Sequence, residues 1–132
     1  MKRSFMANLY VALMHYPVVN KNGKVIASAI TNLDIHDISR AVKTFGSKSL
    51  YVVTPLEDQR AIADRIVSYW VKGAGATYNP KRNEALKLIS VKPSLKEVID
   101  DICAERGKQP KLVVTCAKRQ PGNLSYKAFQ LQ

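Results

Sequence analysis

The sequence predicts a single α/β domain, residues 1–132, built on a mostly parallel β-sheet with helices on both faces. Short apolar runs alternate along the chain with longer segments in which apolar residues recur every three or four positions. Helix-capping residues precede most of these longer segments, and the chain length suits a single core. Strands that are joined through helices pair in parallel, which buries both faces of their sheet.

Four short apolar runs are predicted to form the strands. They span residues 8–14, 50–53, 88–91 and 112–115. Residues typical of turns or of helix starts bound these runs, as expected for strands in an α/β protein. Asn22 and Gly23 mark a turn after the first strand, and an extended stretch at residues 25–30 then leads to the first helix.

The rest of the chain is organised around this first helix. Asp34 is predicted to cap it, because the carboxylate can accept from free backbone N–H groups of the first turn. Gly46 is expected to follow the helix end in the left-handed conformation. A stripe at helical spacing is expected to face the core: Ile35, Ile38, Val42 and Phe45. The opposite, solvated face is expected to carry His36, Arg40 and Lys43.

The second helix is predicted from a capping box. Thr54 and Glu57 have the required spacing, and Pro55 suits the first helical position. The helix should stop near Gly73, and residues 73–76 are predicted to form a flexible loop. One side of this helix carries Ile62, Ile66, Tyr69 and Trp70.

Three more helices follow. Asn79 is predicted to cap a short helix that runs through Leu86. Residues 94–97 form a second capping box, and the helix behind it has the clearest amphipathic pattern in the chain. Gly107 is expected to close that helix, and residues 125–129 begin the last one after a loop at 118–123.

The charge of the chain is the strongest compositional signal. Twenty-one Lys and Arg against ten Asp and Glu give a net charge of +11. This excess favours a polyanionic partner, nucleic acid first and an anionic membrane second, whereas the plainer alternative is a basic solvated surface. No segment is long enough to span a bilayer, and a membrane is not the expected partner. The candidate phosphate contacts are Lys81, Arg82, Lys118 and Arg119.

Other classes of site receive little support. Cys103 and Cys116 have no second pair, so neither a disulfide framework nor a metal site is expected. Both thiols are expected to be reduced, which indicates the cytoplasm. Neither glycine-rich phosphate motif is present. Residues 1–4 faintly resemble the start of a signal peptide, but a first strand explains the apolar residues 9–14 better.

Polar side chains crowd the start of the first helix: Asn32, Asp34, His36 and Asp37. They are candidate ligand contacts, and the alternative is a well-capped surface helix. Residues 69–82 interleave aromatic side chains with cations. Such a surface can stack unpaired bases while its cations hold the backbone, unless Tyr69 and Trp70 belong to the core.

These segments carry a resemblance to a known family. The sequence resembles the SPOUT class of trefoil-knotted RNA methyltransferases, in particular a small bacterial family sometimes fused to the tRNA guanine-N1 methyltransferase. The similarity covers nearly all of the chain. The matching segments are His15-Tyr16-Pro17, Thr31-Asn32-Leu33-Asp34, His36-Asp37-Ile38, Arg40, Tyr51, Val53-Thr54, Tyr78-Asn79-Pro80, Arg82, Glu84-Ala85-Leu86 and Ala117-Lys118.

The resemblance implies a Rossmann-like fold of the SPOUT type and an enzyme that methylates RNA, tRNA before rRNA, with S-adenosylmethionine as cofactor. In this family a further strand, glycine-rich loops and a terminal helix form the knot that binds the cofactor. We expect that region to be missing from a chain that stops at Gln132, so no cofactor-binding residue is named. Knotted relatives dimerise, which implies a homodimer for the complete protein.

The resemblance also implies a catalytic residue, Arg40. Arg40, Phe45-Gly46 and residues 50–55 are similar to the first motif of the branch that methylates the ribose 2′-oxygen, although the motif's asparagine is Asp34 here. A guanidinium keeps its proton at neutral pH, so a positioning role suits Arg40 better than a general-base role. By the same resemblance, the polar residues at the helix start become candidate RNA contacts.

Two alternatives stay open at this stage. One is a non-catalytic RNA-binding α/β module, which cofactor binding would distinguish from an enzyme. The other is a small α/β redox or regulatory domain, which the basic charge and the unpaired cysteines disfavour.

Overall fold

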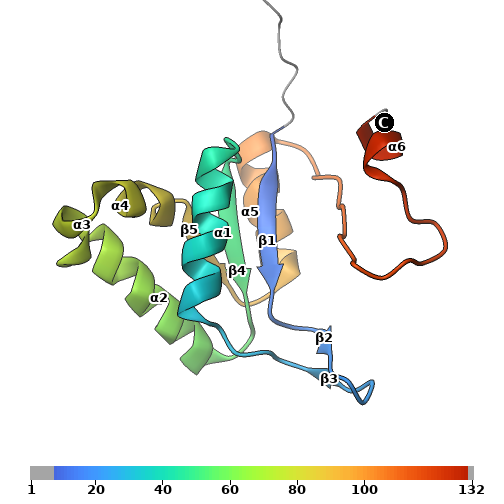
Figure 1. The fold of residues 1–132 in the computed structure, drawn as a ribbon, viewed down its shortest axis with the longest axis horizontal. Coiled ribbons are helices and arrows are strands. Elements are labelled where there is room, and N and C mark those ends of the chain that lie inside the picture. The colour runs from blue at the N-terminus through green and yellow to red at the C-terminus, as the bar shows by residue number, and fades with distance from the viewer. Residues whose placement is uncertain (1–7, 131–132) are drawn as a thin grey trace, which may run out of the picture.

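A three-stranded parallel sheet in the order β1-β4-β5 forms the centre of the computed structural model, which describes residues 8–130 (Figure 1). The strands are β1 (Tyr10–Met14), β4 (Ser49–Val53) and β5 (Ile89–Lys92), and β2 (Val18–Val19) pairs with β3 (Val25–Ile26) in a separate antiparallel hairpin. The helices are α1 (Asn32–Thr44), α2 (Glu57–Val71), α3 (Gly75–Tyr78), α4 (Pro80–Leu86), α5 (Leu95–Arg106) and α6 (Tyr126–Gln130). The leader weighed above, residues 1–4, lies outside the described residues.

Helices cover both faces of the sheet, as predicted. The side chains of Leu50 and Val52 on β4 join one buried cluster with residues of α1, α2 and α4. Those of Tyr51 and Val53, which alternate with them, join a second cluster with α5. Because successive side chains of a strand point to opposite faces, this division places α5 alone behind the sheet (Figure 1). The predicted α/β class with a parallel sheet is confirmed.

The first helix differs from its prediction in its cap. Thr31, not Asp34, is the N-cap: its Oγ1 atom accepts a hydrogen bond from the Asp34 amide at 3.1 Å. Asp34 lies in the first turn, where its negative charge complements the helix dipole. The predicted left-handed glycine at the far end is confirmed, with φ +72° at Gly46.

The buried stripe of α1 is also partly wrong. Ile35 and Val42 are buried as predicted, but Phe45 is 77% exposed. His36, which we placed on the solvated face, is only 9% exposed. The physical reason is that α1 packs against α4 and α2 as well as the sheet. Two neighbouring surfaces bury a wider arc of the helix than a single stripe, and that arc includes His36.

The start of α2 and the glycine segment behind it were predicted wrongly. The helix begins at Glu57 with Leu56 as a cap that makes no side-chain bond. Thr54 is fully buried at the end of β4, where its hydroxyl accepts from the Leu56 amide, so it does not cap the helix. Residues 75–78 form α3 rather than a flexible loop, because Gly75 packs against the α2 side chains.

The helices α4 and α5 confirm their predicted caps. The side chain of Asn79 accepts from the Arg82 amide at 3.1 Å, and that of Ser94 accepts from the Glu97 amide at 3.3 Å. Val98 and Ile102, which belong to the apolar stripe of α5, are buried. Gly107 follows the end of that helix with φ +76°. Cys103 and Cys116 are both free, as predicted.

The predicted fourth strand at residues 112–115 is wrong. After α5 the chain leaves the sheet as an extended arm that leads to α6 (Figure 1). Leu112, Val113 and Val114 are between 57% and 88% exposed. A β-favouring run becomes a strand only when it packs against a neighbour, and the arm gives residues 112–115 none.

Candidate nucleic-acid interface

A groove of about 470 Å³ lies between α1 and α4. Its lining comes from the C-terminal half of α1 and from α4 with its cap: Arg40, Lys43, Thr44, Asn79, Lys81, Arg82, Glu84 and Ala85. Four of these eight residues are cations. Three of the sequence-predicted site residues, Arg40, Lys81 and Arg82, therefore meet in one place.

The local structure of α4 explains why these cations converge. Asn79 caps the helix and Pro80 occupies its first turn, so the side chains of Lys81 and Arg82 start there too. Ala85 and Leu86, one turn later, are buried in the cluster that α4 shares with α1. Burial of this apolar end fixes α4 beside α1 and leaves its cationic end at the groove.

The groove is electropositive because its cations outnumber their partners. Arg40 forms an ion pair with Asp37 at 2.7 Å, and Lys43 lies 3.8 Å from Glu84. Within residues 8–130, Lys81 and Arg82 have no carboxylate within ion-pair distance. These side chains are available to neutralise phosphates of a bound polyanion.

Arg82 is held by an aromatic side chain of α2. Its guanidinium carbon lies 4.8 Å from the centre of the Trp70 ring, and His36 meets the same ring edge-on at 5.4 Å. The indole is confined on another side by Gly75, where an added Cβ would lie only 2.5 Å from Cε3 of Trp70. The buried Nε atom of Arg82 and the buried Nδ1 atom of His36 have no hydrogen-bond partner.

His36 supports the groove from beneath rather than lining it. Burial lowers the pKa of its imidazole, and the positive charges of Arg82 and Arg40 lower that pKa further. The ring is therefore neutral at neutral pH, and it adds no charge to the groove. The residue is only 9% exposed and is not among those that line the groove, and its role as a direct RNA contact stays a prediction.

Asn32 and Asp34 lie at the opposite end of α1 from the groove. The helix starts at the carboxyl edge of the sheet, close to the end of β1, and runs back along the face (Figure 1). Burial lowers the pKa of His15, which directly follows β1. The charge of the nearby Asp34 carboxylate acts in the opposite direction and raises that pKa. His15 is 3% exposed, and its Nδ1 atom has no hydrogen-bond partner.

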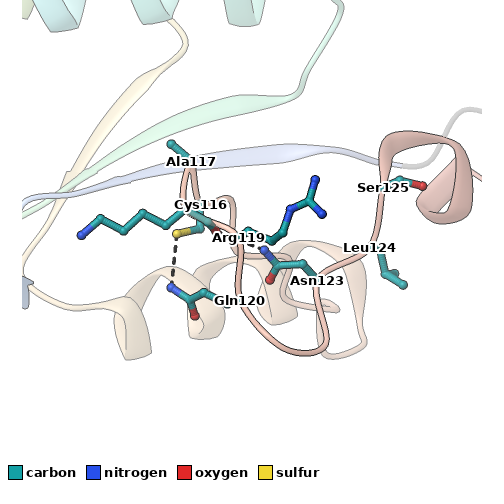
Figure 2. A pocket seen from close by; sticks show the side chains of 8 residues that line it. Cys116, Ala117, Arg119, Gln120, Asn123, Leu124 and Ser125 are labelled. Atoms are coloured by element: carbon teal, nitrogen blue, oxygen red, sulfur yellow. Dashed lines mark hydrogen bonds between the residues drawn. The ribbon is translucent and has the colours of Figure 1, made fainter.

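Lys118 and Arg119 lie in a different part of the molecule. With neighbouring residues they line a hollow of about 540 Å³ in the C-terminal arm. Figure 2 shows this hollow, with Arg119 among the labelled residues. Gln120 donates a hydrogen bond to Sγ of Cys116 there at 3.4 Å. The arm leaves the sheet on the side of β1, whereas α4 lies beyond β5 (Figure 1). The structure thus does not bring this pair together with Lys81 and Arg82.

Two residues of the groove region escaped the sequence-based site prediction. Lys43 follows Arg40 by three positions, a spacing that places both on one helix face. For Trp70 the sequence left a core position and a base-stacking surface open. The side chain is half-buried, and it also contacts Arg82. Only the packing of α4 against α2 reveals that second contact.

Across residues 8–130 there is no cluster of three or more His, Cys, Asp or Glu side chains suited to a metal ion. The same part of the chain contains no helix with the length and apolarity needed to cross a membrane.

Comparison with known proteins identifies the family. The chain is 46% identical over 111 residues to a tRNA (guanine-N(1)-)-methyltransferase of Oleidesulfovibrio alaskensis, and 47% identical over 111 residues to one of Nitratidesulfovibrio vulgaris. These matches cover 84% of this chain but 26% of each relative, so the chain spans about a quarter of their length. An uncharacterized protein of Aquifex aeolicus is 39% identical over 119 residues, 90% of this chain and 58% of that protein. Residues 8–132 match the family described as SAM-dependent RNA methyltransferase, and the chain belongs to that family.

Proposed function

We propose that the protein transfers a methyl group from S-adenosylmethionine to RNA, with tRNA as substrate, and that this chain supplies the RNA-binding groove. Family membership supports the reaction, and the printed names of two relatives support the substrate. The observation that carries the proposal is the convergence of Arg40, Lys81 and Arg82 on one groove. Several cations that line one groove can contact the phosphates of a bound RNA and so position it.

Arg40 is the residue that we place at the reacting end of the RNA. Its side chain is 56% exposed and forms an ion pair with Asp37, so the guanidinium has a defined direction at the groove. A guanidinium remains charged at neutral pH and offers a planar, two-point contact to a phosphate. Arg40 would therefore hold the substrate in orientation, and the proton of the acceptor would leave by another route.

The cofactor does not fit the hollows of the described residues. S-adenosylmethionine carries a sulfonium, an ammonium and one carboxylate, so it is a net cation. The groove presents four cations, and the hollow of the arm presents Lys118 and Arg119. Like charges in such a site would repel the sulfonium. We therefore assign no residue between 8 and 130 to the cofactor and derive no step through it.

The acceptor atom is a separate question. The first motif around Arg40 resembles the ribose 2′-oxygen branch, whereas two relatives are named for the N1 atom of guanine. Nuclease digestion of the methylated RNA followed by mass spectrometry of the nucleosides distinguishes a methylated ribose from 1-methylguanosine. We also propose the trefoil-knot class, a homodimer and a cytoplasmic location, which analytical ultracentrifugation and cell fractionation can check in part.

A non-catalytic RNA-binding role is the second candidate, and the poor fit of the cofactor favours it for this chain taken alone. Methyl transfer from labelled S-adenosylmethionine to total tRNA separates the two functions. Transfer by the full-length protein supports the enzyme. Binding of tRNA without transfer by that protein would support the module instead.

RNA binding itself is tested by its dependence on salt. Four to six phosphate contacts predict a log–log slope of roughly −3 to −5, at about 0.7–0.9 per contact. Lys81→Ala and Arg82→Ala should each make the slope shallower by about 1. Lys96→Ala is the matched control, because Lys96 is an exposed cation of α5, on the other face of the sheet. A slope near zero for the wild-type protein would rule out a nucleic-acid partner.

A further inference from the structure

Two large aromatic side chains are exposed next to the cationic groove. Tyr78, the last residue of α3, is 83% exposed, and Phe45, which follows α1, is 77% exposed. Rings of this size bury a large apolar area when they pack, so a folded chain usually places them in its core. Neither ring joins the two buried clusters described above.

Both aromatic residues are direct chain neighbours of residues that line the groove. Tyr78 directly precedes Asn79, and Phe45 directly follows Thr44, and both of these neighbours line the groove. Tyr78 comes from the α3–α4 side and Phe45 from the α1 side. The two aromatic side chains thus stand within one residue of a surface that carries four cations.

At least one cation of the groove is held in place, while both rings stay exposed. Arg82 is fixed by Trp70, and α4 is fixed by its buried end. A site for unpaired nucleic acid combines aromatic side chains with nearby cations. The cations contact the phosphates of the backbone, and the aromatic rings stack on the bases.

We propose that the groove binds an unpaired segment of RNA, with its phosphates against Arg40, Lys81 and Arg82 and its bases stacked on Tyr78 and Phe45. This inference rests on the proposed function and adds the form of RNA that the groove accepts. In a duplex each base is already stacked between its neighbours, so its faces are not free for an aromatic side chain. Duplex RNA could use only the cations of the groove, and it should bind more weakly.

The test compares two RNAs of the same sequence on the full-length protein. One is an unstructured RNA of about 12 nucleotides, a length that other single-strand-binding domains cover, and the other is its blunt duplex. The single strand should bind more tightly. Tyr78→Ala and Phe45→Ala should each weaken the single strand by about 5-fold to 150-fold and leave duplex binding and the salt slope unchanged.

Two variants serve as controls. Tyr78→Phe keeps the ring and should keep the affinity for the single strand. Tyr126→Ala removes a tyrosine that is 96% exposed on α6, away from the groove, and should have no effect. Tyr78→Ala and Phe45→Ala should both melt at the wild-type temperature, because the side chains that they remove are exposed.

The outcomes separate this inference from the proposed function. Absence of binding to either RNA would overturn both. Equal binding of single strand and duplex, unchanged by Tyr78→Ala and Phe45→Ala but weakened by Arg82→Ala, would overturn the inference alone. If the two RNAs bind equally and the protein also binds vesicles rich in phosphatidylserine, the rings would instead contact an anionic membrane.

Discussion

The guanidinium carbon of Arg82 lies 4.8 Å from the centre of the Trp70 ring, across the junction of α4 and α2. A cation over an indole face is attracted by about 0.5 to 2 kcal/mol, depending on how well water is excluded. This contact restricts a long, flexible side chain to a small range of positions. At least one cation of the groove is therefore already ordered before an anion binds, so its ordering adds little entropic cost to binding.

The packing of Gly75 against Trp70 leads to a prediction about stability. In a helix, Gly→Ala usually stabilises by about 0.5 to 1 kcal/mol. At Gly75 the new Cβ would meet Cε3 of Trp70 at 2.5 Å and Cδ2 at 2.9 Å. Gly75→Ala should therefore lower the free energy of unfolding, by about 1 to 3 kcal/mol, as overpacked sites do. Urea unfolding followed by circular dichroism measures this change.

A double-mutant cycle identifies Trp70 as the cause. In a Trp70→Leu background the ring is gone, and Gly75→Ala should cost at least about 1 kcal/mol less than it does in the wild type. Strictly additive costs would show that the strain arises elsewhere, for example at the Tyr69 ring, whose Cε1 atom also lies 2.9 Å from the added Cβ.

The corrected cap of α1 can be tested by two substitutions. Thr31→Ala removes the hydroxyl that accepts from the Asp34 amide and should destabilise the protein by about 1 kcal/mol. Thr31→Ser keeps that acceptor and should cost much less. Asp34→Ala removes only a charge in the first turn, worth about 0.3 to 1 kcal/mol at low salt. A larger loss from Asp34→Ala than from Thr31→Ala in thermal melts would restore Asp34 as the cap.

Arg40 is predicted to affect the reaction far more than the fold. Its side chain is half-exposed, so Arg40→Ala should change stability by less than about 0.5 kcal/mol. Single-turnover methyl transfer by the full-length protein should fall about 10²-fold or more, which corresponds to about 2.7 kcal/mol. Arg40→Lys should restore only part of the rate, because an ammonium cannot make a planar two-point contact.

The control for Arg40 is the removal of a comparable cation elsewhere. Lys96→Ala, on α5, should leave the rate unchanged. Wild-type transfer by Arg40→Ala, with an unchanged melting temperature, would remove Arg40 from the site. The affinity for S-adenosylmethionine should hardly change, because the groove does not fit that cofactor.

The buried histidines predict how stability depends on pH. Burial lowers the pKa values of both His15 and His36 in the folded state. Below the unfolded value of about 6.5, the unfolded chain therefore binds protons that the folded chain does not. Stability should be fully present above about pH 6.5 and should fall as the pH drops below it, by at most about 1.4 kcal/mol per pH unit for each histidine.

Thermal melts between pH 7.5 and 5 measure this loss. His36→Phe replaces the imidazole with a ring that cannot be protonated, and it should reduce the dependence of the melting temperature on pH. His15→Phe should do the same independently, since neither histidine is among the groups that shift the pKa of the other. An unchanged pH dependence in the double variant would show that carboxylates govern the loss.

The sequence by itself determined the elements that depend on local interactions. Ser94 and Asn79 accept from backbone N–H groups three residues ahead, so their caps follow from neighbouring residues in the chain. The strand at 49–53 is apolar on both faces because helices cover both. These patterns repeat within a few residues, and they predicted the α/β class and the parallel sheet.

Only the tertiary structure decided which side chains these elements bury and which they bring together. His36 is buried because α2 and α4, which come later in the chain, also pack on α1. Phe45 lies beyond the last helical residue as the C-cap of α1, and it is exposed. Residues 112–115 have the composition of a strand, but pairing needs a partner, and the arm leads them away from β1. Arg40 likewise lies near Lys81 and Arg82 only because α4 packs against α1. The sequence shows that these residues are charged, but it does not show which of them are neighbours in the fold.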